Sequence, residues 1–439
     1  MNMQKIGLAL GLMWSSAVLA ATPFTHWQLP GGTEVWLAET HQLPMLDISV
    51  SFPAGSAFDP ADKPGLASLT QRMLDQGAGG MTDVQIADRL ADGGAQLGME
   101  LDADRASVTL RTLSRPEQEQ SALAVMSAVL DQPTFDAGVL QREKARLEEA
   151  LKEEDAEPQM MAAFAFQAAV FAGHPYAHRA SGDVNDVEKL NAGDLHRFWQ
   201  THYTQDHAVI AMVGDVTREQ ANAIATRLVS GLPASAPGVS DAIPPVPSLT
   251  APVLRQISFP SKQSQILIGQ PGVKRGDPDY YALYVGNYVL GGGGFDSRLM
   301  KNVREKQGLA YSVYSYFMPM QQAGAFQIGL QTRTQETATA LHAVRSILHD
   351  FLQNGVTAAE LTQAKDSIIG GFPLRIDSNR KQLEYLSMIA YYHLPADYLE
   401  QFPREVARVT AQQIQLAFRR HLDPDHMVTV VVGDAPALK

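Results

Sequence analysis

Short stretches of the chain alternate between apolar and polar residues, which is the pattern of strands that bury one face. In "LDISVSF" (residues 46–52) the side chains on one face are all apolar: Leu46, Ile48, Val50 and Phe52. The segment "RASVTLRTL" (105–113) alternates in the same way. Because successive side chains of a strand point to opposite sides, both segments predict half-buried strands of a sheet.

Other stretches repeat their apolar residues every three or four positions and predict helices. The segment "TDVQIADRLAD" (82–92) opens with Thr-x-x-Gln, whose two side chains can cap the first turn, and stops at Gly93-Gly94. Residues 121–130 and 137–154 are helical by the same pattern. Strands followed by pairs of helices predict an α+β fold, with a mostly antiparallel sheet and helices packed on one face.

An internal repeat organises the chain. The segment "FWQTHYTQDHAVIAMVGD" (198–215) resembles "FRRHLDPDHMVTVVVGD" (418–434), with matched residues 219 positions apart. Two other matches precede it, at offsets of 218 and 221 residues: Pro53 with Pro271, and 138–144 with 359–365. Three matches in one order at nearly one offset indicate two copies of a domain.

The boundaries of the two copies follow from composition. Residues 232–254 are rich in Pro, Ala and Ser and lack either periodicity, so they predict an extended linker. We therefore expect an N-terminal domain over 21–231 and a homologous C-terminal domain over 255–439.

Residues 1–20 have the features of an export signal. Lys5 precedes an apolar stretch, and Val18-Leu19-Ala20 offers a small-residue cleavage site. A membrane anchor is the alternative, but the apolar stretch is too short to span a bilayer, and no later run of about 20 apolar residues exists. We expect an exported protein that begins near Ala21, periplasmic if the source is Gram-negative.

Charge and cysteine content exclude some classes of protein. The net charge is −12 and the acidic residues are scattered, which argues against a nucleic-acid groove. The chain has no cysteine, so disulfides cannot stabilise it and a large core must.

The stretch "GLASLTQRML" (65–74) places three polar side chains on one side of a predicted helix. Ser68, Gln71 and Arg72 have the spacing of the inverted zinc motif H-x-x-E-H, in which two His bind zinc and the Glu is the base. None of the three is a good zinc ligand, and the fixed cation of Arg72 would repel a metal. We expect no metal at this helix.

These residues carry a specific resemblance. The segment "PAGSAFDPADKPGLASLTQRML" (53–74) resembles the entry to the active-site helix of the pitrilysin/insulinase metallopeptidase family. A second segment, "GHPYAHRASGD" (173–183), resembles sequences of the same family. An acidic third ligand of that family lies 77 residues after the second His, which leads from Arg72 to Glu149. The resemblance implies a degenerate zinc site, and two homologous α/β-sandwich domains that form half of a clam-shell chamber. Because the other zinc ligands are missing and Glu149 lies in a run of acidic residues, we expect it to lie on a solvated helix face or to be an ancestral remnant.

The second copy resembles the C-terminal signature of the same family. In "GGGGFDSRLMKNVREKQGLAYSVYSYF" (291–317), Arg304 and Tyr311 match an Arg/Tyr pair of that signature. The implied role is to bind the substrate backbone in the zinc site of another half and to stabilise the oxyanion. A guanidinium and a phenol are suitable donors for this. By spacing alone, the two would be a helix-surface charge and a strand aromatic. Asp296 or Ser297 is a candidate helix cap.

Histidines give a second set of candidates. His174 and His178 stand four residues apart, but Pro175 separates them in a Gly/Pro-flanked loop and no Glu stands between them, so a metal pair is not favoured. The pair His202 and His207 of the first copy recurs as His421 and His426 in the second, before a strand in each case. This repetition favours a structural role such as closing a loop.

The resemblance implies the metal-free subunit of a heterodimeric zinc peptidase. Its partner would be a homologous H-x-x-E-H subunit that holds the zinc, and its substrate a peptide that adds as a strand mainly to the partner's sheet edge. The corresponding edge here, 93–110, is rich in acid. A non-catalytic scaffold or peptide-binding protein, as a homodimer, is the alternative, and a stand-alone hydrolase with an unfamiliar site is the third. We expect no cofactor in this chain, no nucleic acid and no membrane span.

Overall fold

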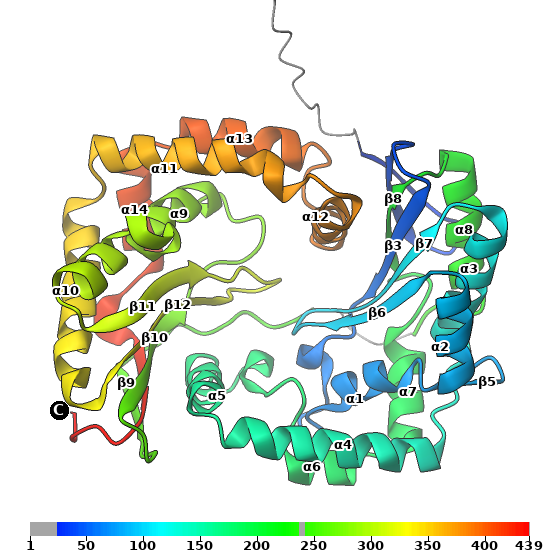
Figure 1. Ribbon diagram of the computed structural model, residues 1–439, viewed down its shortest axis with the longest axis horizontal. Coiled ribbons are helices and arrows are strands. Elements are labelled where there is room, and N and C mark those ends of the chain that lie inside the picture. The colour runs from blue at the N-terminus through cyan, green and yellow to red at the C-terminus, as the bar shows by residue number, and fades with distance from the viewer. Residues whose placement is uncertain (1–23, 237–241, 439) are drawn as a thin grey trace, which may run out of the picture.

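The computed structural model describes residues 24–236 and 242–438 (Figure 1). The first half contains the strands β1 (Thr25–Gln28), β2 (Glu34–Glu39), β3 (Met45–Phe52), β4 (Gly77–Ala78), β5 (Met81–Thr82), β6 (Gln96–Leu101), β7 (Ala106–Leu113) and β8 (Val209–Gly214). Its helices are α1 (Leu66–Met73), α2 (Asp83–Asp92), α3 (Pro116–Asp131), α4 (Ala137–Asp155), α5 (Pro158–Val170), α6 (Val184–Lys189), α7 (Ala192–His202) and α8 (Arg218–Val229). The expected export signal over 1–20 lies outside the described residues.

The second half repeats this plan. Its strands are β9 (Val253–Ile257), β10 (Gln263–Pro271), β11 (Ala310–Phe317), β12 (Ala325–Arg333) and β13 (Val428–Val432). Its helices are α9 (Tyr280–Asn287), α10 (Thr337–Asn354), α11 (Ala358–Gly371), α12 (Asn379–Tyr391), α13 (Tyr398–Arg408) and α14 (Ala411–His421). Two π-helical segments, Tyr288–Gly292 and Met300–Lys306, lie between α9 and β11.

Each half is built on one mixed sheet. The first sheet has the order β1-β2-β8-β3-β7-β6 and the second the order β11-β12-β10-β13-β9. All pairs are antiparallel except β2 with β8 and β9 with β13. β4 and β5 form a separate hairpin. The α+β class that the sequence predicts is confirmed.

Local signals in the sequence placed several elements correctly. The predicted strands 46–52 and 105–113 are β3 and β7, which pair with Ile48 opposite Leu110. The predicted helix 82–92 is α2, and Thr82 and Gln85 form the capping box in both directions. The described part of the predicted linker 232–254 forms no helix or strand until β9 begins at Val253.

One expectation about β3 is wrong. The alternation of β3 predicts a strand with one solvated face, yet Asp47, Ser49 and Ser51 are buried as well. Helix α12 of the second half covers this polar face, and the Ser387 hydroxyl lies 3.3 Å from the Ser49 hydroxyl and 3.4 Å from the Ser51 hydroxyl. The polar face of β3 is buried because α12, which is distant in the sequence, packs on it.

The two halves exchange one helix each. α5 of the first half packs on β10 and β13, and α12 of the second half packs on β2, β3 and β8; both lie between the two sheets, on opposite sides of the centre (Figure 1). Phe166 of α5 joins Val430 in one buried cluster, and Leu386 of α12 joins Trp36 in another. The core of each half therefore includes side chains of the other.

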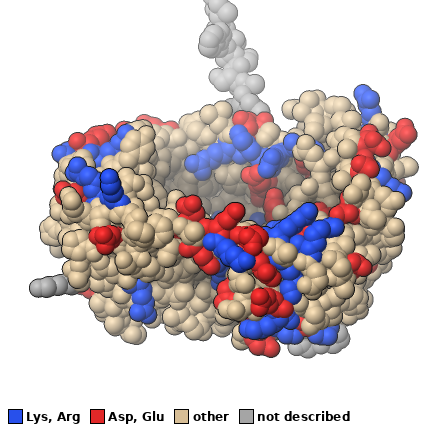
Figure 2. Space-filling view, turned by 60° about the horizontal axis from the view of Figure 1, so that its bottom comes forward, with Lys and Arg blue, Asp and Glu red and all other residues tan. Residues whose placement is uncertain are grey.

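The surface carries no single-signed patch on the face in Figure 2. Acidic and basic side chains interleave there, and the molecule is hollowed between its two halves (Figure 2). Among the helices in the described ranges, none is long and apolar enough to cross a membrane.

The exchange of helices makes a prediction about stability. Phe166→Ala should lower the free energy of unfolding by about 3–5 kcal/mol, because a buried ring is replaced by a cavity. Denaturant unfolding followed by circular dichroism measures this. Phe164→Ala on the same helix is the matched control, since Phe164 is only partly buried. Equal losses from the two variants would show that α5 does not hold the second sheet.

Candidate functional site

Helix α1 starts at a fixed position because one carboxylate holds its first turn. The two oxygens of Asp59 accept hydrogen bonds from the N–H groups of Gly65, at 2.8 Å, and Ala67, at 2.7 Å, which would otherwise lack partners at the helix start. Gly65 has φ 88°, and a Cβ there would lie 2.5 Å from the Ser181 carbonyl oxygen. Only glycine allows this approach, so α1 is fixed against the loop at Ser181.

Gln71 occupies the position of the base in H-x-x-E-H, and its side chain links α1 to neighbouring elements by hydrogen bonds. Its side chain is 3% exposed. Its Nε2 donates to the Ser107 carbonyl at 2.8 Å, and its Oε1 accepts from the Tyr203 hydroxyl at 2.6 Å. The amide therefore ties α1 to β7 and to the end of α7. A neutral amide is also no base, so Gln71 cannot activate a water as the Glu of the motif does.

Ser68 and Arg72 take the two His positions. Ser68 is partly buried, and the Arg72 guanidinium lies 3.7 Å from the buried carboxylate of Glu143 on α4. Arg146 holds the same carboxylate at 2.7 Å. An ion pair between α1 and α4 thus stands where a metal would require neutral imidazoles.

Glu149 lies on the exposed side of α4. Its side chain is 72% exposed and pairs with Lys152 at 2.7 Å. The buried positions of α4 recur three or four residues apart and include Glu143 but not Glu149. Counting from Arg72 therefore identified a solvated acid, and the acid that contacts α1 is Glu143, which the sequence reasoning missed.

Arg304 and Tyr311 lie together. The Arg304 guanidinium is 4.8 Å from the centre of the Tyr311 ring and 4.7 Å from that of Phe295, so it makes cation–π contacts with both rings. Tyr311 is 82% exposed and Phe295 62%. Sequence reasoning did not single out Phe295, although an aromatic residue directly after four glycines was a visible signal.

The local backbone explains why these side chains meet. Arg304 lies on the π-helical segment Met300–Lys306. The helical residues begin at Arg298, directly after Ser297. The Ser297 hydroxyl accepts from the Met300 N–H at 3.4 Å and donates to the Gly294 carbonyl at 2.7 Å. The cap predicted at Ser297 is confirmed. Tyr311 lies on the edge strand β11, where the pairing with β12 shifts register between Ala310 and Val313, and such a bulge redirects side chains.

The glycine run serves close packing. A Cβ at Gly291 would lie 2.4 Å from the Ser315 hydroxyl oxygen, and one at Gly293 would lie 2.6 Å from the Tyr288 carbonyl oxygen. The run begins inside the π-helical turn Tyr288–Gly292 and does not follow a strand, unlike a phosphate-binding loop.

Both ring nitrogens of His174 form hydrogen bonds with backbone groups. Its Nδ1 accepts from the Tyr176 N–H at 3.1 Å, so its Nε2 donates to the Pro244 carbonyl at 2.7 Å. Both ring nitrogens are used, and His174 does not form a metal pair with His178.

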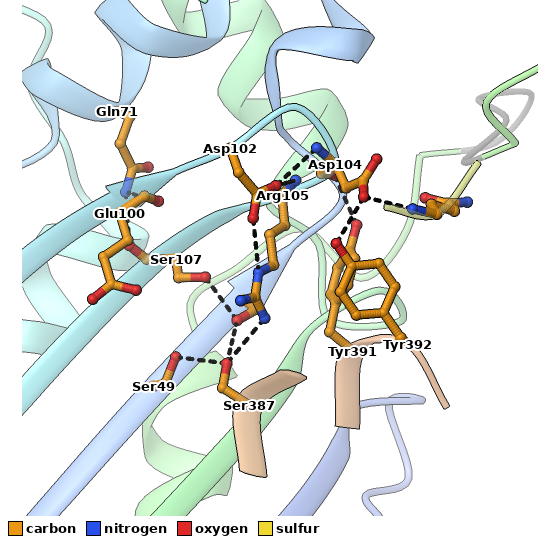
Figure 3. A network of polar contacts seen from close by, with 12 residues as sticks. Ser49, Gln71, Glu100, Asp102, Asp104, Arg105, Ser107, Ser387, Tyr391 and Tyr392 are labelled. Atoms are coloured by element: carbon orange, nitrogen blue, oxygen red, sulfur yellow. Dashed lines mark hydrogen bonds and ion pairs between the residues drawn. The ribbon is translucent and has the colours of Figure 1, made fainter. Parts of the chain in front are cut away.

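A buried carboxylate at the β6–β7 turn connects the two halves (Figure 3). Asp104 is fully buried. Its Oδ1 accepts from the Tyr176 hydroxyl at 2.5 Å, and its Oδ2 accepts from the Tyr392 hydroxyl and the Gln321 N–H, both at 2.7 Å. Burial raises the pKa of Asp104, while these three donors lower it. Tyr392 and Gln321 come from the second half.

Arg105 extends the same connection to α12. It lies 3.3 Å from Asp102 and donates to the Ser387 hydroxyl at 3.2 Å (Figure 3). Two of the acids in the edge segment 93–110 are therefore held by internal contacts, Asp102 by Arg105 and Asp104 by its three donors. Glu100 is exposed on β6, the edge strand of the first sheet.

Known proteins share this sequence and this architecture. A family model described as "Insulinase (Peptidase family M16)" matches residues 34–183, and one described as "Peptidase M16 inactive domain" matches residues 189–368. A crystal structure of a peptidase M16 inactive domain from Pseudomonas fluorescens superposes with a TM-score of 0.90 at 36% identity, over 95% of this chain and 99% of that one. This chain belongs to the insulinase (M16) peptidase family.

Two more comparisons place the M16 chain among its relatives. It is 25% identical to "Non-peptidase homolog YmxG" of Helicobacter pylori over 435 residues, which is 98% of either protein. The periplasmic protease PqqL from Escherichia coli shares the fold, with a TM-score of 0.80 at 16% identity, and the match covers 46% of that chain. The clam-shell architecture expected from the resemblance is thereby confirmed, and the chain is an M16 homologue without the zinc motif.

Asp59 makes the stability of the chain depend on pH. Burial raises its pKa to about 7, against the opposing effect of the two N–H donors, whereas an Asp in the unfolded chain loses its proton near pH 4. Between these values the folded state binds more protons, so the free energy of unfolding should fall as pH rises, by at most about 4 kcal/mol. The measurement compares wild type with Asp59→Asn at pH 4.5 and 7.5. The stability of wild type relative to the variant should decrease at the higher pH, and a constant difference would contradict the assignment.

Asp104→Ala should lower the free energy of unfolding by about 3–5 kcal/mol, because buried donors from both halves lose their acceptor. Urea denaturation measures the loss. Glu100→Ala in the same hairpin is the control, and as an exposed position it should change stability by about 0.5 kcal/mol or less. A similarly small loss in Asp104→Ala would show that the connection between the halves lies elsewhere.

Proposed function

We propose that this M16 chain is the metal-free subunit of an exported two-chain zinc peptidase. The observation that carries the proposal is the contrast between its two candidate sites. The side chains of the zinc-motif helix, Gln71 and Arg72, are engaged in structural contacts, whereas Tyr311 is 82% exposed and contacts the partly buried Arg304.

Arg304 and Tyr311 together have the chemistry of a substrate-binding site. Stacking between Phe295 and Tyr311 restricts the Arg304 guanidinium before any ligand arrives. A preorganised guanidinium and a phenol hydroxyl can donate to a peptide carbonyl and to the oxyanion that forms from it. Neither group can activate a water molecule. The water and the zinc would therefore come from a homologous partner that carries H-x-x-E-H, and the peptide would lie between the two chains.

The sizes of relatives support a two-part enzyme. PqqL is named a periplasmic protease, and a match to 95% of this chain covers 46% of it, which leaves room for a second part of similar size. The export signal over residues 1–20 supports a place in the periplasm if the source is Gram-negative. In this proposal zinc is a cofactor of the partner, and this chain needs none for the peptidase reaction.

Turnover of the reconstituted complex tests the proposal. With the H-x-x-E-H partner present, Arg304→Ala should lower kcat/KM for a peptide by about 10²–10³-fold, because one preorganised donor is lost, and Tyr311→Phe should also lower it. Neither chain alone should cut efficiently. Arg333→Ala, an exposed arginine at the end of the same sheet, is the control and should leave turnover unchanged. Full activity in Arg304→Ala would refute the proposal.

A non-catalytic scaffold or peptide-binding protein is the second candidate. The name of the Helicobacter pylori relative, "Non-peptidase homolog", favours it. Measuring the mass in solution, with and without an H-x-x-E-H chain, distinguishes the two candidates. A stable homodimer that does not bind such a chain fits a scaffold. A one-to-one complex fits the peptidase subunit.

A further inference from the structure

Each copy of the repeat ends a helix with a histidine that closes a loop. His202 ends α7 and His421 ends α14. The Nδ1 atom of His202 lies 3.0 Å from the Pro53 carbonyl oxygen, and that of His421 lies 3.4 Å from the Gly272 carbonyl oxygen. A carbonyl oxygen only accepts, so Nδ1 carries a proton in both copies. The loop-closing role that the repeat predicted is confirmed.

The second ring nitrogen has different neighbours in the two copies. His202 is buried beside Phe58 and Phe198, and burial lowers its pKa to about 4, so its ring is neutral. His421 instead directs Nε2 at two carboxylates, 3.1 Å from Asp279 and 3.7 Å from Asp277. The residue of the first copy that matches Asp277, Asp59 at an offset of 218 residues, instead accepts from the N–H groups of Gly65 and Ala67.

The loop fixes both carboxylates on the same side of the ring. The Asp279 N–H donates to the Asp277 carboxylate at 2.9 Å, which holds the two residues in one turn. Ligand atoms of all three side chains lie within 4.8 Å of one another. Their exposed fractions are 14% for His421, 17% for Asp277 and 20% for Asp279, so the group is partly desolvated and still open to a small ion.

We propose that Asp277, Asp279 and His421 bind one divalent metal ion of the Mn²⁺ or Zn²⁺ class. An imidazole nitrogen and two carboxylate oxygens are ligands that both ions accept. Ligands about 2.1 Å from an ion and at right angles lie about 3.0 Å apart, close to the separation of His421 from Asp279. With Nδ1 protonated and held by a carbonyl, Nε2 offers its lone pair, the arrangement usual for a metal-bound histidine. The ion would join the β10–α9 loop to the end of α14.

Arg420 is the competing cation. Its guanidinium lies 2.5 Å from the Asp279 carboxylate, and its side chain is 63% exposed, so it can move away when an ion binds. Arg420 should therefore weaken metal binding without preventing it.

Titration of the EDTA-treated full chain with MnCl₂, followed by calorimetry and by the electron paramagnetic resonance signal of free Mn²⁺, tests the proposal. Wild type should bind one ion. Asp279→Asn, which keeps the shape of the side chain, should bind at least about 10-fold more weakly, and Arg420→Ala should bind several-fold more tightly. Circular dichroism and thermal melting without metal show whether each variant is folded.

His41→Ala is the matched control. His41 also lies between two acids, but Asp215 meets its Nδ1 and Glu39 its Nε2, so the acids lie at opposite ring nitrogens and cannot share an ion with one of them. This variant should bind Mn²⁺ as wild type does. The proposal is overturned if wild type binds neither Mn²⁺ nor Zn²⁺, or if Asp279→Asn binds as well as wild type. None of these residues belongs to the Arg304–Tyr311 site, so the result is independent of peptidase activity.

Discussion

The hydrogen bonds around Asp104 are the constraint on which the arrangement of the two halves depends. One buried carboxylate accepts from Tyr176 of the first half and from Tyr392 and Gln321 of the second. Because the carboxylate belongs to the turn between β6 and β7, the edge strand of the first sheet has a fixed position relative to the second half. Helix α12 lies on the same turn through Ser387 and Arg105. The width of the hollow between the sheets therefore follows from a few directional contacts in addition to the apolar core.

The degenerate zinc helix has become part of the framework. The Gln71 amide forms hydrogen bonds with the Ser107 carbonyl and the Tyr203 hydroxyl. Arg72 neutralises part of the charge on Glu143. Restoring ligands at these positions would remove contacts that hold α1 to its neighbours. The side chains that stand at the motif positions also form these internal bonds, so the helix is well packed in a chain that lacks the motif.

Local signals in the sequence were enough for elements whose causes are local. The capping box of α2, the alternation of β3 and the cap at Ser297 depend on residues a few positions apart. The burial of Asp47 and Ser49 could not be predicted, because their cover is α12 from the other half. Spacing along one helix also could not separate Glu143 from Glu149, since the choice depends on which face of α4 meets α1. The nearness of Arg304 and Tyr311 followed from a family resemblance and not from a pattern in the chain itself.

The reciprocal positions of α5 and α12 have a consequence for either copy taken alone. In each half, one face of the sheet is covered by a helix that belongs to the other half. A single copy in isolation would leave that surface in water and would be driven to associate. The two copies of the repeat are therefore one folding unit, although the sequence divides them at a linker.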